Sequence, residues 1–131
     1  MLNLKRILTK IGEKLTSLDG RPYIIEQGAV SYCSYRKWSD GTLEQWGTAS
    51  VASISGNAAQ TVNLAVPFVD TGYTVTLSRG NNATTSVTVF AECNHVNGNR
   101  ERTVSTFKVS AFKTGYAYTI GFGFYVVGKW K

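Results

Sequence analysis

The sequence predicts an all-β protein, an antiparallel β-sandwich or jelly-roll-like domain preceded by a short N-terminal coiled-coil helix. After residue 20, apolar and polar residues alternate along several short runs, as in strands with one buried face and one wet face. Turn-forming residues separate these runs at regular intervals. A heptad of apolar residues is confined to residues 2–18. The chain is therefore divided into a helix, residues 1–19, and a β-sandwich head, residues 20–131.

The helix is predicted from apolar residues that recur at alternating spacings of four and three, namely Leu4, Leu8, Ile11, Leu15 and Leu18. Asp19 and Gly20 end it, because Gly readily adopts the left-handed cap conformation. About two and a half heptads are too few for an isolated coiled coil. Two interpretations stay open: the helix lies on the core of its own domain, or it joins several chains. Gly12 costs about 1 kcal/mol relative to Ala, which packing must offset.

The head is predicted to contain only strands, which we place at Tyr23–Gln27, Ser31–Trp38, Thr42–Ser53, Gln60–Pro67, Tyr73–Ser78, Ser86–Cys93, Thr103–Phe112 and Tyr116–Trp130. Asp40-Gly41 between two of these runs is a strong hairpin signal, because Gly supplies the positive φ that the turn needs. Other turns are expected at residues 55–57, 70–72, 79–82, 97–99 and 114–115.

The last strand has two faces of different character. Ile120, Phe122, Phe124 and Val126 share one face, whereas Gly121, Gly123, Tyr125 and Val127 share the other. Because both faces are apolar or small, we predict a strand buried on both sides. Gly121 and Gly123 would let a second sheet or a neighbouring subunit approach closely.

The composition and charge of the chain argue against several classes of protein. With 43% hydrophobic and 17% charged residues, the chain is globular. It has no apolar run long enough to span a membrane, and Lys10, Glu13 and Lys14 interrupt the N-terminal apolar run, so no signal peptide is expected. The net charge of +6 is spread along the chain, and the sequence predicts neither a nucleic-acid partner nor membrane insertion. Without a signal peptide, Cys33 and Cys93 are expected as free thiols, although their pairing stays open.

No pattern indicates catalysis, a metal or a cofactor. The chain has one His and no Cys-x-x-Cys, so a zinc site of the usual kind is not expected, and no two carboxylates stand out as an acid–base pair. Loops on a rigid β scaffold carry binding function instead. The candidate receptor-binding residues are therefore those of the two richest polar loops, Arg79, Asn81, Asn82, His95, Asn97, Asn99 and Arg100. The alternative is that these Asn residues only form turns.

Two segments resemble a known family. Tyr35-Arg36-Lys37-Trp38, a polar turn with Gly, and Trp46-Gly47 resemble the opening of the C-terminal domain of many bacteriophage tail-fibre proteins. Ile24-Ile25-Glu26-Gln27-Gly28 precedes them, as in that family, and Gly128-Lys129-Trp130-Lys131 is similar to the family's usual ending. The resemblance implies a homotrimer, with Leu4, Leu8, Ile11, Leu15 and Leu18 at the interface. It also implies that Trp38 and Trp46 belong to the core or a subunit interface rather than forming platforms for a sugar.

From the resemblance we expect a viral adhesion protein, the trimeric receptor-binding tip of a phage tail fibre. Its partners would be a bacterial surface glycan or protein and other tail or fibre proteins of the virion, with synthesis in the host cytoplasm. Whether the chain is a fragment of a longer fibre stays open. An alternative is a monomeric or dimeric carbohydrate-binding module with its helix packed on its own sheet. A weaker alternative is a glycosidase that would use Glu44, Glu92 or Glu101.

Overall fold

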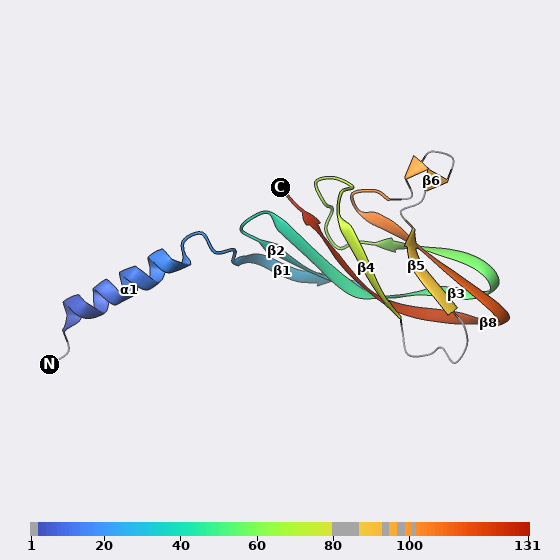
Figure 1. Ribbon diagram of the computed structural model, residues 1–131, viewed down its shortest axis with the longest axis horizontal. Coiled ribbons are helices and arrows are strands. Elements are labelled where there is room, and N and C mark those ends of the chain that lie inside the picture. The colour runs from blue at the N-terminus through green and yellow to red at the C-terminus, as the bar shows by residue number, and fades with distance from the viewer. Residues whose placement is uncertain (1–2, 80–86, 93–94, 97–98, 101) are drawn as a thin grey trace.

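The computed structural model describes residues 3–79, 87–92, 95–96, 99–100 and 102–131 (Figure 1). It contains one helix and a set of strands: α1 Leu4–Leu18, β1 Ile24–Val30, β2 Cys33–Trp38, β3 Thr42–Asn63, β4 Thr74–Arg79, β5 Val87–Glu92, β6 His95–Val96, β7 Asn99–Arg100 and β8 Thr106–Lys129. Every strand pairing among these residues is antiparallel. The predicted all-β class with a short N-terminal helix is confirmed.

The head is built on one long strand pair. The main sheet has the order β1-β2-β3-β8-β4, and β5 also pairs with β8. β3 and β8 pair from Thr42↔Lys129 to Asn63↔Thr106, with register shifts between Val51 and Gly56. Beyond those shifts the pair curls back over the rest of the sheet (Figure 1). β4 pairs with residues 122–127 of β8 and β5 with residues 108–113. A single continuous sheet therefore forms both layers of the head.

The core lies between these two layers. Phe107, on the returning part of β8, meets Phe124 of the first layer edge to face, with ring centroids 5.6 Å apart. The buried apolar residues among those described are Cys33, Leu43, Val51, Val62, Phe68, Tyr73, Phe107, Val109, Ala111, Ile120, Phe122, Phe124 and Val126. Residues from both halves of β3 and both halves of β8 contribute, so the fold of the long pair creates the core.

Two predicted turns are wrong. Residues 55–57 lie inside β3 and residues 114–115 lie inside β8. Gly56 pairs with Lys113 and Asn57 with Phe112, and residues 114–115 lie in β8 between Lys113 and Tyr118, at the register shift of the pair. Pairing of the long strands thus overrides the local turn preference of Gly and Asn. Four runs predicted as separate strands are consequently two long ones, and β3 ends at Asn63 rather than at Pro67.

The prediction that the last strand is buried on both sides is right for one face only. Ile120, Phe122, Phe124 and Val126 are buried as expected. The opposite face of β8 is partly open, and Tyr125 keeps 39% of its surface exposed. Close approach occurs at Gly123, where an added Cβ would lie 2.5 Å from Ser78 Oγ, whereas one at Gly121 would meet nothing within 4 Å.

A buried polar side chain fixes the segment that follows β3. Gln45 is fully buried; its Nε2 donates to the Val66 carbonyl at 2.7 Å and its Oε1 accepts from the Val66 N–H at 3.0 Å. Both backbone groups of Val66 are therefore satisfied without a neighbouring strand. The neighbouring Cys33 is a free, buried thiol, and burial raises its pKa. Cys93 lies outside the described residues.

The N-terminal segment stands apart from this core. α1 projects from the head beyond the end of the β1–β2 hairpin (Figure 1) and contacts none of the described strands. The exposed fractions of Leu4, Leu8 and Ile11 are 67%, 59% and 50%. In the described part of the chain no helix is both long and apolar enough to span a bilayer.

Candidate functional site

The predicted receptor-binding loops fall at two different places. Arg79 ends β4, where it pairs with Phe122, and the strand β5 begins only after that loop. β6 and β7 follow the other end of β5, with His95 opposite Arg100 and Val96 opposite Asn99. The two loops therefore leave opposite ends of β5, and their role in binding a receptor stays a prediction. Asn81, Asn82 and Asn97 lie outside the described residues.

The two segments that carry the family resemblance lie side by side. Thr42 pairs with Lys129, which places the Asp40-Gly41 turn against the chain end. The Trp130 N–H donates to the Gly41 carbonyl at 3.0 Å, and its indole Nε1 donates to the Trp38 carbonyl at 3.1 Å. Gly41 adopts a φ of 89°, as the predicted hairpin turn requires. The resemblance thus corresponds to one structural unit made from both ends of the head.

A polar and aromatic cluster covers the outer face of the main sheet, which is the face turned away from the core. We call Arg36, Trp38, Glu44, Trp46 and Tyr125 the Glu44 cluster. Residues two apart on a strand share a face, so Arg36 and Trp38 of β2 meet Glu44 and Trp46 of β3. Tyr125 joins from β8, where it pairs with Trp46.

Glu44 links the members of this cluster. Its Oε2 accepts a hydrogen bond from Trp38 Nε1 at 2.6 Å, and its Oε1 accepts one from the Tyr125 hydroxyl at 2.5 Å. The Arg36 guanidinium lies 5.4 Å from the centroid of the Trp46 ring and 5.7 Å from that of Trp38. The hydrogen bond to the carboxylate raises the pKa of Tyr125 to about 12. The cluster therefore holds three aromatic side chains in fixed positions at the surface.

Two shallow hollows flank the cluster. One, of about 290 Å³, is lined by Trp46, Gly47, Thr48, Thr76, Ser78, Gly123, Phe124 and Tyr125. The other, of about 270 Å³, is lined by Pro22, Trp38, Asp40, Thr42 and Glu44. Trp38 and Trp46 are each partly buried at this face and are not members of the core. The prediction that they belong to the core is therefore wrong, and the subunit-interface alternative stays a prediction.

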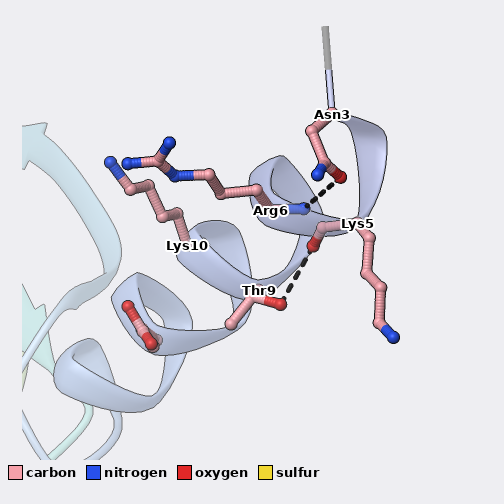
Figure 2. A pocket seen from close by; sticks show the side chains of 6 residues that line it. Asn3, Lys5, Arg6, Thr9 and Lys10 are labelled. Carbon is pink, nitrogen blue, oxygen red and sulfur yellow. Dashed lines mark hydrogen bonds between the residues drawn. The ribbon is translucent and has the colours of Figure 1, made fainter.

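The N-terminal helix presents a second kind of surface. Its basic face holds a hollow of about 510 Å³ lined by Asn3, Lys5, Arg6, Thr9, Lys10 and Glu13 (Figure 2). Asn3 caps the helix, because its Oδ1 accepts from the Arg6 N–H at 3.3 Å. Leu4, Leu8 and Ile11 follow the apolar spacing. The side chains of Leu15 and Leu18 lie outside the described part of the structure.

β1 carries a second set of exposed apolar side chains. It forms one edge of the sheet, and its residues are all exposed. Large apolar side chains left in solvent on and beside it are Tyr23, Ile24, Ile25, Val30 and Tyr32. Glu26 anchors the strand, since Lys37 Nζ and the Tyr35 hydroxyl both donate to its carboxylate at 2.8 Å. The bond from Lys37 is the main reason that the pKa of Glu26 is lowered.

Comparison with known proteins gives one family and several similar structures. A family described as "tail fiber protein gp53-like, C-terminal" matches residues 37–129. An N-truncated R1-type pyocin tail fiber is similar in fold, with a TM-score of 0.55, 16% identity, and 98% of each chain covered. A C-terminal part of the P. aeruginosa R1 pyocin fiber has a TM-score of 0.54 and 18% identity over 79% of this chain. The chain spans 28% of that fiber. No curated protein sequence matches the chain.

Among the described residues, no three His, Cys, Asp or Glu side chains gather as metal ligands.

Proposed function

Because the chain belongs to the family of gp53-like tail fiber proteins, we propose that it forms the trimeric, receptor-binding head of a tail fibre on a virion or a phage-like particle. The head would recognise a glycan or protein of the bacterial surface by binding alone. Other tail or fibre proteins would hold it on the particle through the N-terminal side.

The observation that carries the trimer is the apolar surface of α1 and β1. Leu4, Leu8 and Ile11 lie on the helix at heptad spacing, and Ile24 and Val30 are exposed on the edge strand β1. Exposed apolar patches mark interaction sites in soluble proteins. A homotrimer would bury it against copies of the same segment. In a monomeric carbohydrate-binding module the helix would pack on its own sheet, which α1 does not contact among the described strands.

The trimer is tested by the absolute mass of the purified chain in solution, measured by light scattering during size-exclusion chromatography. We expect about three times the 14.3 kDa mass of one chain. A mass of one chain at micromolar and higher concentration would contradict the proposal.

Receptor binding is tested with whole bacteria. We expect the labelled protein to bind host cells and to compete with adsorption of the parent particle. Three linked sites would raise the apparent affinity by about 100-fold or more over one site. A monomeric variant should therefore bind cells far more weakly than the trimer. If the trimeric protein bound no bacterial surface and blocked no adsorption, the adhesion proposal would be wrong.

A further inference from the structure

We propose that the hollow beside Trp46 on the outer face of the sheet binds a single uncharged sugar unit of a bacterial surface glycan. This inference rests on the proposed adhesive function and deepens it. It assigns a contact site to the strands β3, β4 and β8 rather than to the loops that the sequence singled out. We call this hollow the Gly123 hollow.

The strand register builds the hollow. Thr48, Gly123 and Ser78 form one row across β3, β8 and β4, and Trp46, Tyr125 and Thr76 form the next row. Gly123 makes room for the Ser78 side chain, because a Cβ at Gly123 would lie 2.5 Å from Ser78 Oγ. The hollow therefore depends on a glycine between two hydroxyl-bearing residues, with aromatic rings in the adjacent row.

The lining matches the chemistry of a sugar ring. A sugar presents an apolar C–H face and an edge of hydroxyl groups. Trp46 and Tyr125 supply aromatic surface, and the hydroxyls of Thr48, Thr76 and Ser78 can both donate and accept hydrogen bonds. All three hydroxyl-bearing residues are exposed, and none of their hydroxyl groups makes a hydrogen bond within the part of the chain that the structure describes.

The charge and the volume of the Gly123 hollow restrict the class of ligand that it can bind. None of the residues that line the Gly123 hollow is charged, so the hollow offers no counter-charge to a phosphate or a carboxylate. Its volume of about 290 Å³ lies at the lower end of the range of small-molecule sites. These two properties favour one neutral residue of a longer polysaccharide over an anionic sugar or an extended oligosaccharide.

The Glu44 cluster fixes the aromatic walls before a ligand arrives. The Arg36 guanidinium lies over the Trp46 ring, and Glu44 accepts the hydrogen bond from the Tyr125 hydroxyl. Side chains that are already ordered lose less conformational entropy on binding. Arg36 and Glu44 are thus positioning residues for the hollow and do not line it.

The test uses the full chain and small neutral sugars as probes. The indole N–H signals of Trp38, Trp46 and Trp130 are followed by NMR during titration with methyl glycosides of a hexose, a 6-deoxyhexose and an N-acetylhexosamine. Because Trp38 and Trp130 donate their indole N–H groups within the protein, we expect a saturable shift centred on Trp46. The variants Thr76→Val and Ser78→Ala should each weaken binding about two- to tenfold by removing one hydrogen bond.

Matched controls separate this site from its alternatives. Thr74→Val changes the same kind of residue on the same face of β4, outside the hollow, and should leave the affinity unchanged. Ser78→Arg should block the hollow, abolish sugar binding and leave the mass of the assembly unchanged. If Ser78→Arg lowered the mass, the hollow would be a contact between subunits and the proposal would be overturned.

Two further outcomes would also overturn it: an equal effect of Thr74→Val and Thr76→Val, or no Trp46 shift with any of the probes. Binding of the unmodified protein to whole bacteria is measured in parallel. Cells bound equally by the unmodified protein and by Ser78→Arg would overturn this site while leaving the adhesive function intact.

Discussion

The N-terminal segment, residues 3–30, and the β3–β8 pair differ in where their apolar side chains lie. In β3 and β8, the large apolar residues of one face are buried between the two layers, as Leu43 and Phe107 are. In residues 3–30, apolar residues of similar size, such as Leu4, Ile24 and Val30, are exposed. Each buried side chain of this size contributes about 1.5–3 kcal/mol to folding stability relative to an exposed one. Burial within one chain therefore stabilises the β3–β8 pair far more than it stabilises residues 3–30.

This difference separates folding from assembly. The head has its own core and satisfies buried polar groups such as the Gln45 amide within one chain. Among the described side chains of residues 3–30, Leu4, Leu8, Ile11, Ile24 and Val30 have the apolar character of core residues but are exposed. We infer that the head folds by itself and that the N-terminal segment gains its burial from other copies. The following predictions test that separation, in order of decreasing effect.

The largest effect is expected from Leu8→Asp in α1. A carboxylate at an apolar heptad position should abolish the three-chain assembly, because a buried unpaired charge costs several kcal/mol. Light scattering should give the mass of one chain, while the unfolding midpoint of the head, followed by Trp fluorescence, should stay unchanged. Lys10→Ala on the basic face serves as the control and should keep the assembly. A head that unfolded with the helix would remove the distinction between the two regions.

Phe107→Ala should give the next largest effect, on the other side of the comparison. Loss of a fully buried Phe leaves a cavity in the core and should lower the free energy of unfolding by about 3–5 kcal/mol. Denaturant unfolding followed by circular dichroism measures it. Phe107→Leu should cost less, since it fills more of the space. An unchanged midpoint for Phe107→Ala would show that this layer does not hold the head together.

Gln45→Leu should lower the free energy of unfolding by about 2 kcal/mol or more. The substitution leaves the partly buried N–H and carbonyl of Val66 without their partner, and each unsatisfied group, where water cannot replace the partner, costs about 1–3 kcal/mol. Gln27→Leu, on the exposed strand β1, is the matched control and should be close to neutral for the head. Similar losses for the two variants in denaturant unfolding would mean that β1 belongs energetically to the head.

The smallest effect concerns Tyr125 and pH. Its pKa is raised from an ordinary value of about 10 to about 12, so the neutral phenol is favoured in the folded protein. The stability from its bond to Glu44 is present below about pH 10 and is lost as the pH rises towards 12. Phenolate absorbance is titrated in the unmodified protein and in Tyr125→Phe, and the difference between the two curves should show that Tyr125 ionises at high pH. The variant Glu44→Gln should lower the pKa of Tyr125. A difference curve centred near pH 10 would contradict the hydrogen bond.

The structural features that could be predicted from the sequence are those set by residues close together in the chain. The Asp40-Gly41 turn, the helix α1 and the buried face of residues 120–126 follow from local spacing, and the structure contains each of them. The outer-face position of Arg36, Trp38, Glu44 and Trp46 was also open to prediction, because their spacing of two around a hairpin turn places them on one face. Residue types alone pointed instead to the polar loops at the two ends of β5.

The features that could not be predicted are those set by the pairing of strands that lie far apart in the sequence. Residues 55–57 and 114–115 have the composition of turns, but they lie inside the long strands β3 and β8, which pair with each other on both sides of these stretches. The same register brings Tyr125 to Glu44 and sets Gly123 between Thr48 and Ser78. Each of these contacts joins residues that are distant in sequence, and no local period encodes which strands become neighbours.

The direction of β1 relative to α1 has a mechanical consequence. If the head is anchored through α1 and held by a cell at its far side, tension enters the fold at Ile24 and runs along the axis of β1. β1 is paired with β2 from Ile24↔Trp38 to Val30↔Cys33, so the hydrogen bonds of that ladder bear the load together, in shear, rather than opening one after another. Such a strand resists a pull along its length better than one from the side, which suits a particle that must stay attached to a moving cell.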